Sequence, residues 1–325
     1  MKQNRRFFTE SHRSDRKASL LSPAILSFAC AALLLITRLL DGILLSGDGI
    51  YLSVVVLQII IFLLPASIWI GLRGEGYVSK IRLKPGKPET LLLSLSASFV
   101  LITGGLLISL FCSGLHNLTG TFTLYETFQN DVGSGFSGPP LYLILAYAVL
   151  PAICDEILFR SILCAEYERH GLSVAVLAST VLFSFLHFNF VGLPVYLFSG
   201  FVLAVTAYLC RSVWGAIIAH FIYNLFGLFG QPYISTFYEI TGSVALFYFV
   251  LVSSFLLSLA LFCGETARLC KLYAMRNYEH IPVPKTREGL SVPFHVRCKV
   301  ALLRPDAIGT AILWLSASIL FLLID

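Results

Sequence analysis

The sequence is poor in charged residues. Only 13% of its 325 residues are Asp, Glu, Lys or Arg, whereas 57% are hydrophobic. A soluble domain carries about 25% charged residues, so this composition excludes an ordinary soluble fold. Uninterrupted apolar runs of about 17 to 25 residues, long enough to cross ~30 Å of hydrocarbon, predict an all-α polytopic transmembrane bundle. We count nine spans, or eight if one is re-entrant, at approximately 21–45, 50–72, 90–113, 140–164, 172–189, 193–210, 213–229, 241–263 and 306–324.

The sequence also lacks several patterns that would point to other classes of protein. Its eight cysteines include no CxxC pair, which argues against a disulfide framework and a zinc ribbon. No internal repeat is visible, although secondary transporters usually have two related halves. A cleavable signal peptide is not expected, because the first apolar run is longer than the hydrophobic region of such a peptide.

The basic residues form no single patch, which argues against nucleic acid as a partner despite a net charge of +5. Of 23 Lys and Arg residues, six lie in the N-terminal tail, five in the loop after the second run and eight in the loop before the last run. Loops rich in Lys and Arg face the cytoplasm. This rule places the tail 1–20 and the segments 73–89, 165–171 and 264–305 in the cytoplasm and the loop 114–139 outside. We expect a multi-pass protein of the plasma membrane, with the lipid bilayer as one partner.

The fourth apolar run carries three charges, in the stretch CDEILFR. Each charge at the centre of a span costs about 2.5–3.5 kcal/mol, so Asp155, Glu156 and Arg160 need compensation. Glu156 and Arg160 are four residues apart, with the acid first, which favours an ion pair. Asp155 lies about 100° around the helix from Glu156 and has no such local partner. It must therefore face a neighbouring helix or a water-filled cavity. Pro151 lacks an amide hydrogen and is expected to kink the helix there.

Two of the seven histidines lie in or at the edge of apolar runs. His187 follows Phe183 by one helical turn, and His220 precedes Asn224 by one turn. Carboxylates, histidines and an amide together can activate a water molecule and stabilise an oxyanion. The plainer alternative is a set of packing residues around a structural ion pair. Arg38, in the first run, is interpreted as the local partner of Asp41.

Three motifs on separate runs carry a resemblance to a known family. The chain reads DExxxR from Asp155, FxxxH from Phe183 and HxxxN from His220. These motifs resemble EExxxR, FxxxH and HxxxN/B of the CPBP family of intramembrane proteases, which includes the CAAX-processing Ras-converting endopeptidase and the Abi-type bacterial proteins. The resemblance covers roughly residues 140–230, which would be the catalytic core. The segment 21–139 would supply N-terminal helices and 231–325 C-terminal helices.

The resemblance implies a role for each acid of the first motif. Asp155 would act with His187 as the base that activates a water molecule for attack on a peptide carbonyl. Glu156 would lie beside it, held by Arg160, and support the geometry of the site. The family usually has Glu at the first position, and Asp155 is one methylene shorter. That difference leaves three alternatives. The helices lie closer together, Glu156 takes the role, or activity is low or absent.

The resemblance also implies that His220 and Asn224 donate hydrogen bonds to the oxyanion. An acid and two histidines could instead bind a catalytic zinc ion, but no HExxH helix is present, and we favour chemistry without a metal or other cofactor. The substrate would be a membrane protein or peptide whose identity the sequence does not give, and the oligomeric state is equally open. A catalytically silent family member acting as an immunity or scaffold protein stays an alternative, and a secondary transporter a weaker one.

Overall fold

The computed structural model describes residues 22–40, 50–113, 140–277, 284–285 and 291–324. This part of the chain is helical apart from an isolated bridge between Lys285 and Ser291. The α-helices are α2 (Ala24–Leu39), α4 (Ile50–Gln58), α5 (Leu64–Arg73), α6 (Leu91–Ser113), α8 (Pro140–Ile144), α9 (Leu150–Asp155), α10 (Cys164–Tyr167), α11 (Leu172–Phe185), α12 (Leu193–Cys210), α13 (Val213–Phe229), α14 (Gln231–Thr241), α15 (Val244–Met275), α16 (Phe294–Leu302) and α17 (Pro305–Ile324). Three π-helical stretches are η1 (Ile59–Leu63), η5 (Leu145–Val149) and η6 (Glu156–Leu163). Short 3-10 turns are η2 (Glu75–Tyr77), η3 (Pro88–Thr90) and η7 (Glu168–His170).

Each predicted apolar run coincides with a helix, and the all-α fold is confirmed. Six helices in the described part are long and apolar enough to cross a membrane: Leu52–Arg73, Pro88–Cys112, Leu141–His170, Leu193–Cys210, Val244–Met275 and Pro305–Leu323. Three further apolar helices are shorter, namely α2, α11 and α13. The number of spans, their orientation and the division of the chain into segments stay predictions. The tail 1–20, Asp41 and the outer loop 114–139 lie outside the described residues.

The segment 264–305 contains more helix than its interpretation as a loop suggested. Helix α15 continues to Met275, well beyond the apolar run that ended near residue 263, and α16 occupies Phe294–Leu302. The extension has the sequence GETARLCKLYAM, which is rich in strong helix formers. Hydropathy marks where a helix leaves an apolar environment, whereas backbone hydrogen bonding can continue into a polar one.

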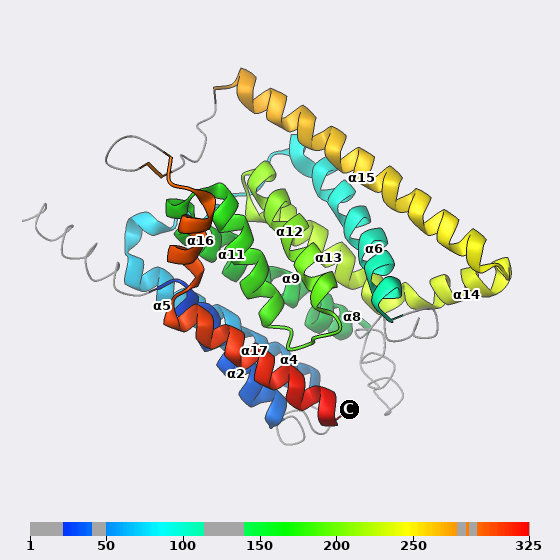
Figure 1. Cartoon of the computed structure of the whole chain (residues 1–325), viewed down its shortest axis with the longest axis horizontal. Helices are drawn as coiled ribbons and strands as arrows, with labels where there is room; N and C mark the ends of the chain where they lie inside the picture. Colours follow the sequence, from blue (N-terminus) through cyan, green and yellow to red (C-terminus); the bar gives the residue numbers. More distant parts are fainter. Residues whose placement is uncertain (1–21, 41–49, 114–139, 278–283, 286–290, 325) are drawn as a thin grey trace, which may run out of the picture.

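The helices pack around a central group that positions the site. Helices α6, α12 and α13 pack against one another, and α11 packs against α12. Helix α15 lies along α6 at one edge of the molecule, while α2 and α17 pack together at the opposite side (Figure 1). The continuous helical segment α8–η5–α9–η6–α10 runs between these groups and carries the acidic motif.

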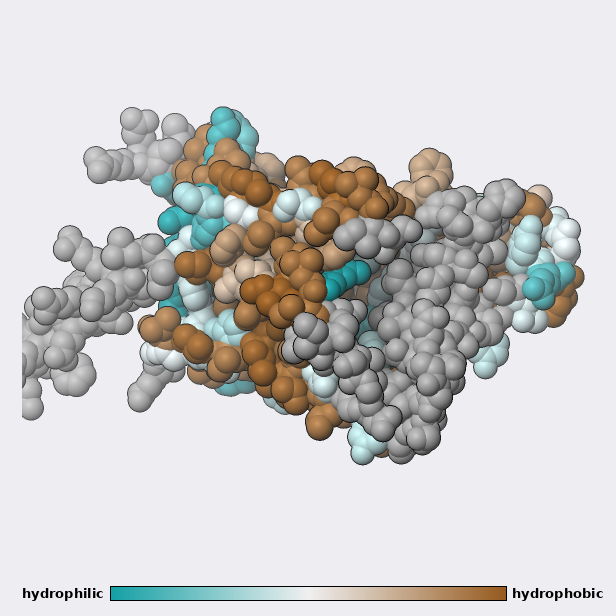
Figure 2. Space-filling view, turned by 90° about the horizontal axis from the view of Figure 1, so that it is seen from below, coloured by the Kyte–Doolittle hydropathy of each residue, from teal (hydrophilic) through white to brown (hydrophobic). Residues whose placement is uncertain are grey.

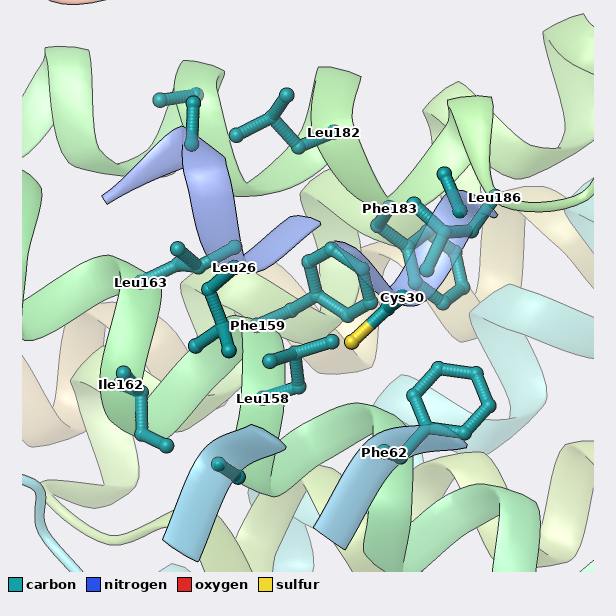
Figure 3. Close-up of a cluster of buried hydrophobic side chains, with 14 of the residues drawn as sticks. Leu26, Cys30, Phe62, Leu158, Phe159, Ile162, Leu163, Leu182, Phe183 and Leu186 are labelled. Carbon is teal, nitrogen blue, oxygen red and sulfur yellow. The ribbon is translucent and has the colours of Figure 1, made fainter. Parts of the chain in front are cut away.

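Aromatic and aliphatic side chains from distant segments form the core beside this segment. Phe159 of η6 and Phe183 of α11 meet edge to face, with ring centroids 5.4 Å apart. Side chains of α2 and η1 pack around them, including Leu26 and Phe62 (Figure 3). Gly200 lets α12 approach α11 closely, because an added Cβ would lie 3.2 Å from the Cα of Thr180. Small residues commonly permit such close approach between membrane helices.

Pro151 lies between two π-helical stretches, η5 and η6. In the i→i+5 pattern of a π-helix, the carbonyl of Ala146 would accept from the amide of residue 151, which proline lacks. Gln58 of α4 supplies the missing donor, because its Nε2 donates to the Ala146 carbonyl at 2.8 Å. The expected disturbance at Pro151 therefore takes the form of π-helical turns, the second of which begins at Glu156.

Candidate active site

The ion pair expected between Glu156 and Arg160 is confirmed. Arg160 Nη1 lies 3.2 Å from Glu156 Oε1, and the two residues are 1% and 0% exposed. Two opposite charges removed from solvent are stable only when the pairing geometry is good and other polar atoms are satisfied. The pair therefore requires further partners.

Arg160 joins three helical segments. Its Nη2 donates to the carbonyl of Gly200 on α12 at 3.1 Å. The guanidinium group also lies 4.3 Å from the centroid of the Phe183 ring on α11. A cation over an aromatic face is attracted by the ring quadrupole, more strongly where water is excluded. Arg160 is thus held by η6, α11 and α12 at the same time.

Glu156 has a second partner, His220 of α13. The Nδ1 atom of His220 lies 2.9 Å from Glu156 Oε1. A carboxylate only accepts hydrogen bonds, so Nδ1 carries the hydrogen and Nε2 is the atom left for other contacts. The acidic motif and the HxxxN motif, 64 residues apart, are therefore in direct contact.

His187 is held by its own helix end and by a neighbouring aromatic ring. Its Nδ1 lies 3.0 Å from the carbonyl oxygen of Phe183. Because a carbonyl can only accept, Nδ1 must carry the hydrogen, and in the neutral ring Nε2 keeps its lone pair. The ring of Tyr196 stacks on His187, with centroids 3.9 Å apart and an interplanar angle of 24°. An added Cβ at Gly192 would lie 2.7 Å from the Tyr196 ring, so glycine leaves room for this stacking.

Four of the six predicted site residues line one cavity of about 600 Å³. These residues are Asp155, His187, His220 and Asn224, whereas Glu156 and Arg160 lie behind the cavity wall. On the face viewed from below, a few hydrophilic atoms are visible in a recess next to hydrophobic ones (Figure 2). Asp155 thus lines a cavity, one of the two surroundings that its position in the helix requires. Within the described residues, no hydrogen bond joins Asp155 directly to His187, so a molecule between them is needed if they act together.

Several residues of this cavity could not be assigned to it from the sequence. Tyr196 and Gln58 were not singled out, and Arg38 was assigned to a local pair with Asp41, which lies outside the described residues. Gln58 is the only amide side chain in the run 50–72, and that isolation is a signal that could have been used. Tyr196 gave no such signal, because a tyrosine near the end of an apolar helix is ordinary.

In the described ranges, no group of three or more His, Cys, Asp or Glu side chains is placed to hold a metal ion. The Nδ1 atoms of both cavity histidines are engaged by protein acceptors, and their Nε2 atoms are the ones available to a ligand or substrate. A reaction without a cofactor stays a prediction.

Comparison with known proteins bears on the segment that carries these motifs. Residues 137–226 match the family model described as type II CAAX prenyl endopeptidase Rce1-like. A protein of Bacillus subtilis (strain 168), named "Putative membrane peptidase YdiL", is 35% identical over 88 residues, which are 27% of this chain and 36% of that protein. The chain therefore matches about a third of the length of this curated relative. No solved structure matches.

The helical fold and the shared cavity define a multi-pass membrane protein with a carboxylate and histidine site. The matches over residues 137–226 support the resemblance of the three motifs to the CPBP family. The similarity is thus to membrane peptidases of the CAAX-protease type.

Proposed function

We propose that this protein is an intramembrane endopeptidase that hydrolyses a peptide bond of a membrane-associated protein or peptide. The observation that carries the proposal is the meeting of Asp155, His187, His220 and Asn224 in one cavity. These residues come from three separate helical segments, and such convergence is not required for helix packing alone. Intramembrane ionisable residues that face a cavity are by default candidates for function. The proposed location is the plasma membrane.

The first step is activation of a water molecule. The water would lie between Asp155 and His187, whose Nε2 lone pair is free to accept a proton. Its oxygen attacks the carbonyl carbon of the scissile bond while the proton passes to the acid and histidine pair. Tyr196 keeps the imidazole ring in place during this transfer, because the stacked rings resist rotation.

The second step is stabilisation of the tetrahedral intermediate. Asn224 can donate from its amide to the oxyanion, and His220 can donate from Nε2 when both ring nitrogens are protonated. The Glu156 carboxylate holds the ring through its contact with Nδ1, which leaves Nε2 as the nitrogen that can reach the substrate. The proton taken from water then moves to the amide nitrogen, the carbon–nitrogen bond breaks, and an acid and an amine leave.

The first acid of the motif, Asp155, is shorter than the usual glutamate, which raises the question of which acid acts as the base. Asp155 reaches less far than glutamate would, yet it lines the cavity with both histidines. The neighbouring Glu156 contacts Arg160 and His220 and does not line the cavity. The geometry therefore favours Asp155 as the base. A catalytically silent family member would retain the helices and the ion pair without needing the cavity groups.

The proposal is tested by changing cavity residues one at a time. A tagged membrane protein or peptide substrate is followed in cells or vesicles with Asp155→Asn, His187→Ala and, as a matched control, His170→Ala, which lies outside the cavity. We expect the first two variants to lose at least about 100-fold in cleavage rate, in line with general acid–base contributions of 10²–10⁴. Unchanged cleavage by both folded variants would refute the assignment. A strong chelator in the same assay tests the prediction that no metal is needed.

A further inference from the structure

Arg38 is a cation at the wall of the proposed active-site cavity. It lies in the last turn of α2, and its side chain is exposed. It lines the same cavity as Asp155 and His187, and it lies within electrostatic range of His187 and Tyr196. An arginine in an apolar helix costs several kcal/mol unless it finds a partner or water. Its position therefore calls for water or an anionic partner.

The contacts of Arg38 with the described residues leave its hydrogen-bond donors available. The guanidinium carbon lies 4.5 Å from the centroid of the Phe321 ring on α17, so the flat face of the group is covered. Such a contact orients the guanidinium plane but uses none of its five N–H donors. Within the described residues, no carboxylate lies within ion-pair distance of Arg38. The edge of the group matches the two oxygens of a carboxylate, which it can bind in a bidentate manner.

We propose that Arg38 and Phe321 form a subsite that binds a carboxylate of the substrate. This inference rests on the proposed peptidase function, since it gives a binding place to a charged group of the peptide that would occupy the cavity. The carboxylate could belong to the C-terminal residue of the substrate or to an Asp or Glu side chain. Both elements that build the subsite, α2 and α17, lie outside residues 137–226. The subsite would thus give this chain a preference for substrates that carry a carboxylate there, which the matched segment alone does not supply.

Binding of short amphiphilic probes tests the subsite without relying on cleavage. The full-length protein in non-ionic detergent is titrated with N-decanoyl-alanine, N-decanoyl-alaninamide and the α-amide of N-decanoyl-aspartic acid. We expect at least one of the two acids to bind about tenfold or more tightly than the alaninamide, because hydrogen bonds to charged groups contribute most where water is scarce. Tight binding of the first acid assigns the subsite to a C-terminus, and tight binding of the second to an acidic side chain.

Variants separate the subsite from general effects of charge. Arg38→Gln should remove the difference between acid and amide, whereas Lys299→Gln, which deletes an exposed positive charge on α16, should keep it. Asp41→Asn should also keep it, because the subsite does not depend on a local pair with Asp41. Equal binding of acids and amide to the unchanged protein, or a difference that survives Arg38→Gln, would overturn the proposal.

A lipid partner is the main competing explanation for this cation. Didecanoyl phosphatidic acid is therefore titrated in the same way. If this lipid binds the protein more tightly than either acid does, and Arg38→Gln abolishes that binding, Arg38 binds a lipid phosphate and the proposal is wrong. Because each readout is binding, these outcomes are distinct from those of the cleavage assay with Asp155 and His187 variants.

Discussion

The three charges of the acidic motif have two different environments. Glu156 and Arg160 are buried and form an ion pair with each other, with Gly200 and His220 as additional partners. Asp155, the adjacent residue, instead lines the cavity. The same short stretch thus combines a structural ion pair with a group that is free to meet a substrate.

The buried pair leads to a prediction about stability. Glu156→Gln keeps the shape of the side chain but leaves the Arg160 charge without its counter-ion. Breaking a buried pair in this way costs about 3–5 kcal/mol, so the free energy of unfolding in detergent micelles should fall by that amount. The matched control Glu265→Gln disrupts the more exposed pair with Arg268 and should cost much less, because solvent screens an exposed pair. Similar losses in the two variants would contradict the prediction.

At the scale of the element, the helix that carries the acidic motif is irregular. Its π-helical turns on either side of Pro151 change the direction in which successive side chains point. Asp155 closes the regular stretch α9 and Glu156 opens the π-helical stretch η6. The neighbouring helix α4 supports this irregularity through the side chain of Gln58.

Gln58 can be tested as the donor that replaces the missing amide of Pro151. Gln58→Leu leaves the Ala146 carbonyl without its donor, and an unsatisfied buried acceptor costs about 1–3 kcal/mol. The loss is measured by chemical unfolding in micelles. Adding Pro151→Ala to this variant should recover part of it by supplying an amide hydrogen. The control Ser67→Ala removes an exposed hydroxyl that bonds only to its own helix. A loss no larger than that of the control would show that Gln58 has no such role.

At the scale of the whole molecule, the helices form a bundle whose outer surface is apolar. Helix α15, for example, leaves Phe249, Leu256, Leu257 and Leu261 exposed. Large exposed apolar residues are expected where lipid is the solvent. The alternation of basic loops gives this bundle a predicted direction in the membrane.

The predicted direction can be tested by labelling single cysteines. The exposed or partly exposed native cysteines are first replaced: Cys112, Cys263, Cys270 and Cys298. A cysteine at Lys84 should then react with a membrane-impermeant thiol reagent only when the cytoplasmic face is accessible. A cysteine at Thr119, in the predicted outer loop, should react in intact cells. Labelling of both positions from one side would show that the predicted topology is wrong.

Local sequence determined much of this protein, for physical reasons that act over short distances. The apolar runs predict helices because a backbone in lipid must satisfy its own hydrogen bonds. The pair Glu156–Arg160 follows from a four-residue spacing along one helix. The order of the three motifs was enough to indicate the family of residues 137–226.

Only the tertiary structure decided which distant groups meet. The contact of Glu156 with His220, the stacking of Tyr196 on His187 and the place of Arg38 at the cavity all depend on how separate helices pack. Periodicity along a helix gives the face on which a side chain lies but not the neighbour that this face contacts. That choice depends on side-chain shape and close packing across the whole bundle, which no single stretch of sequence contains.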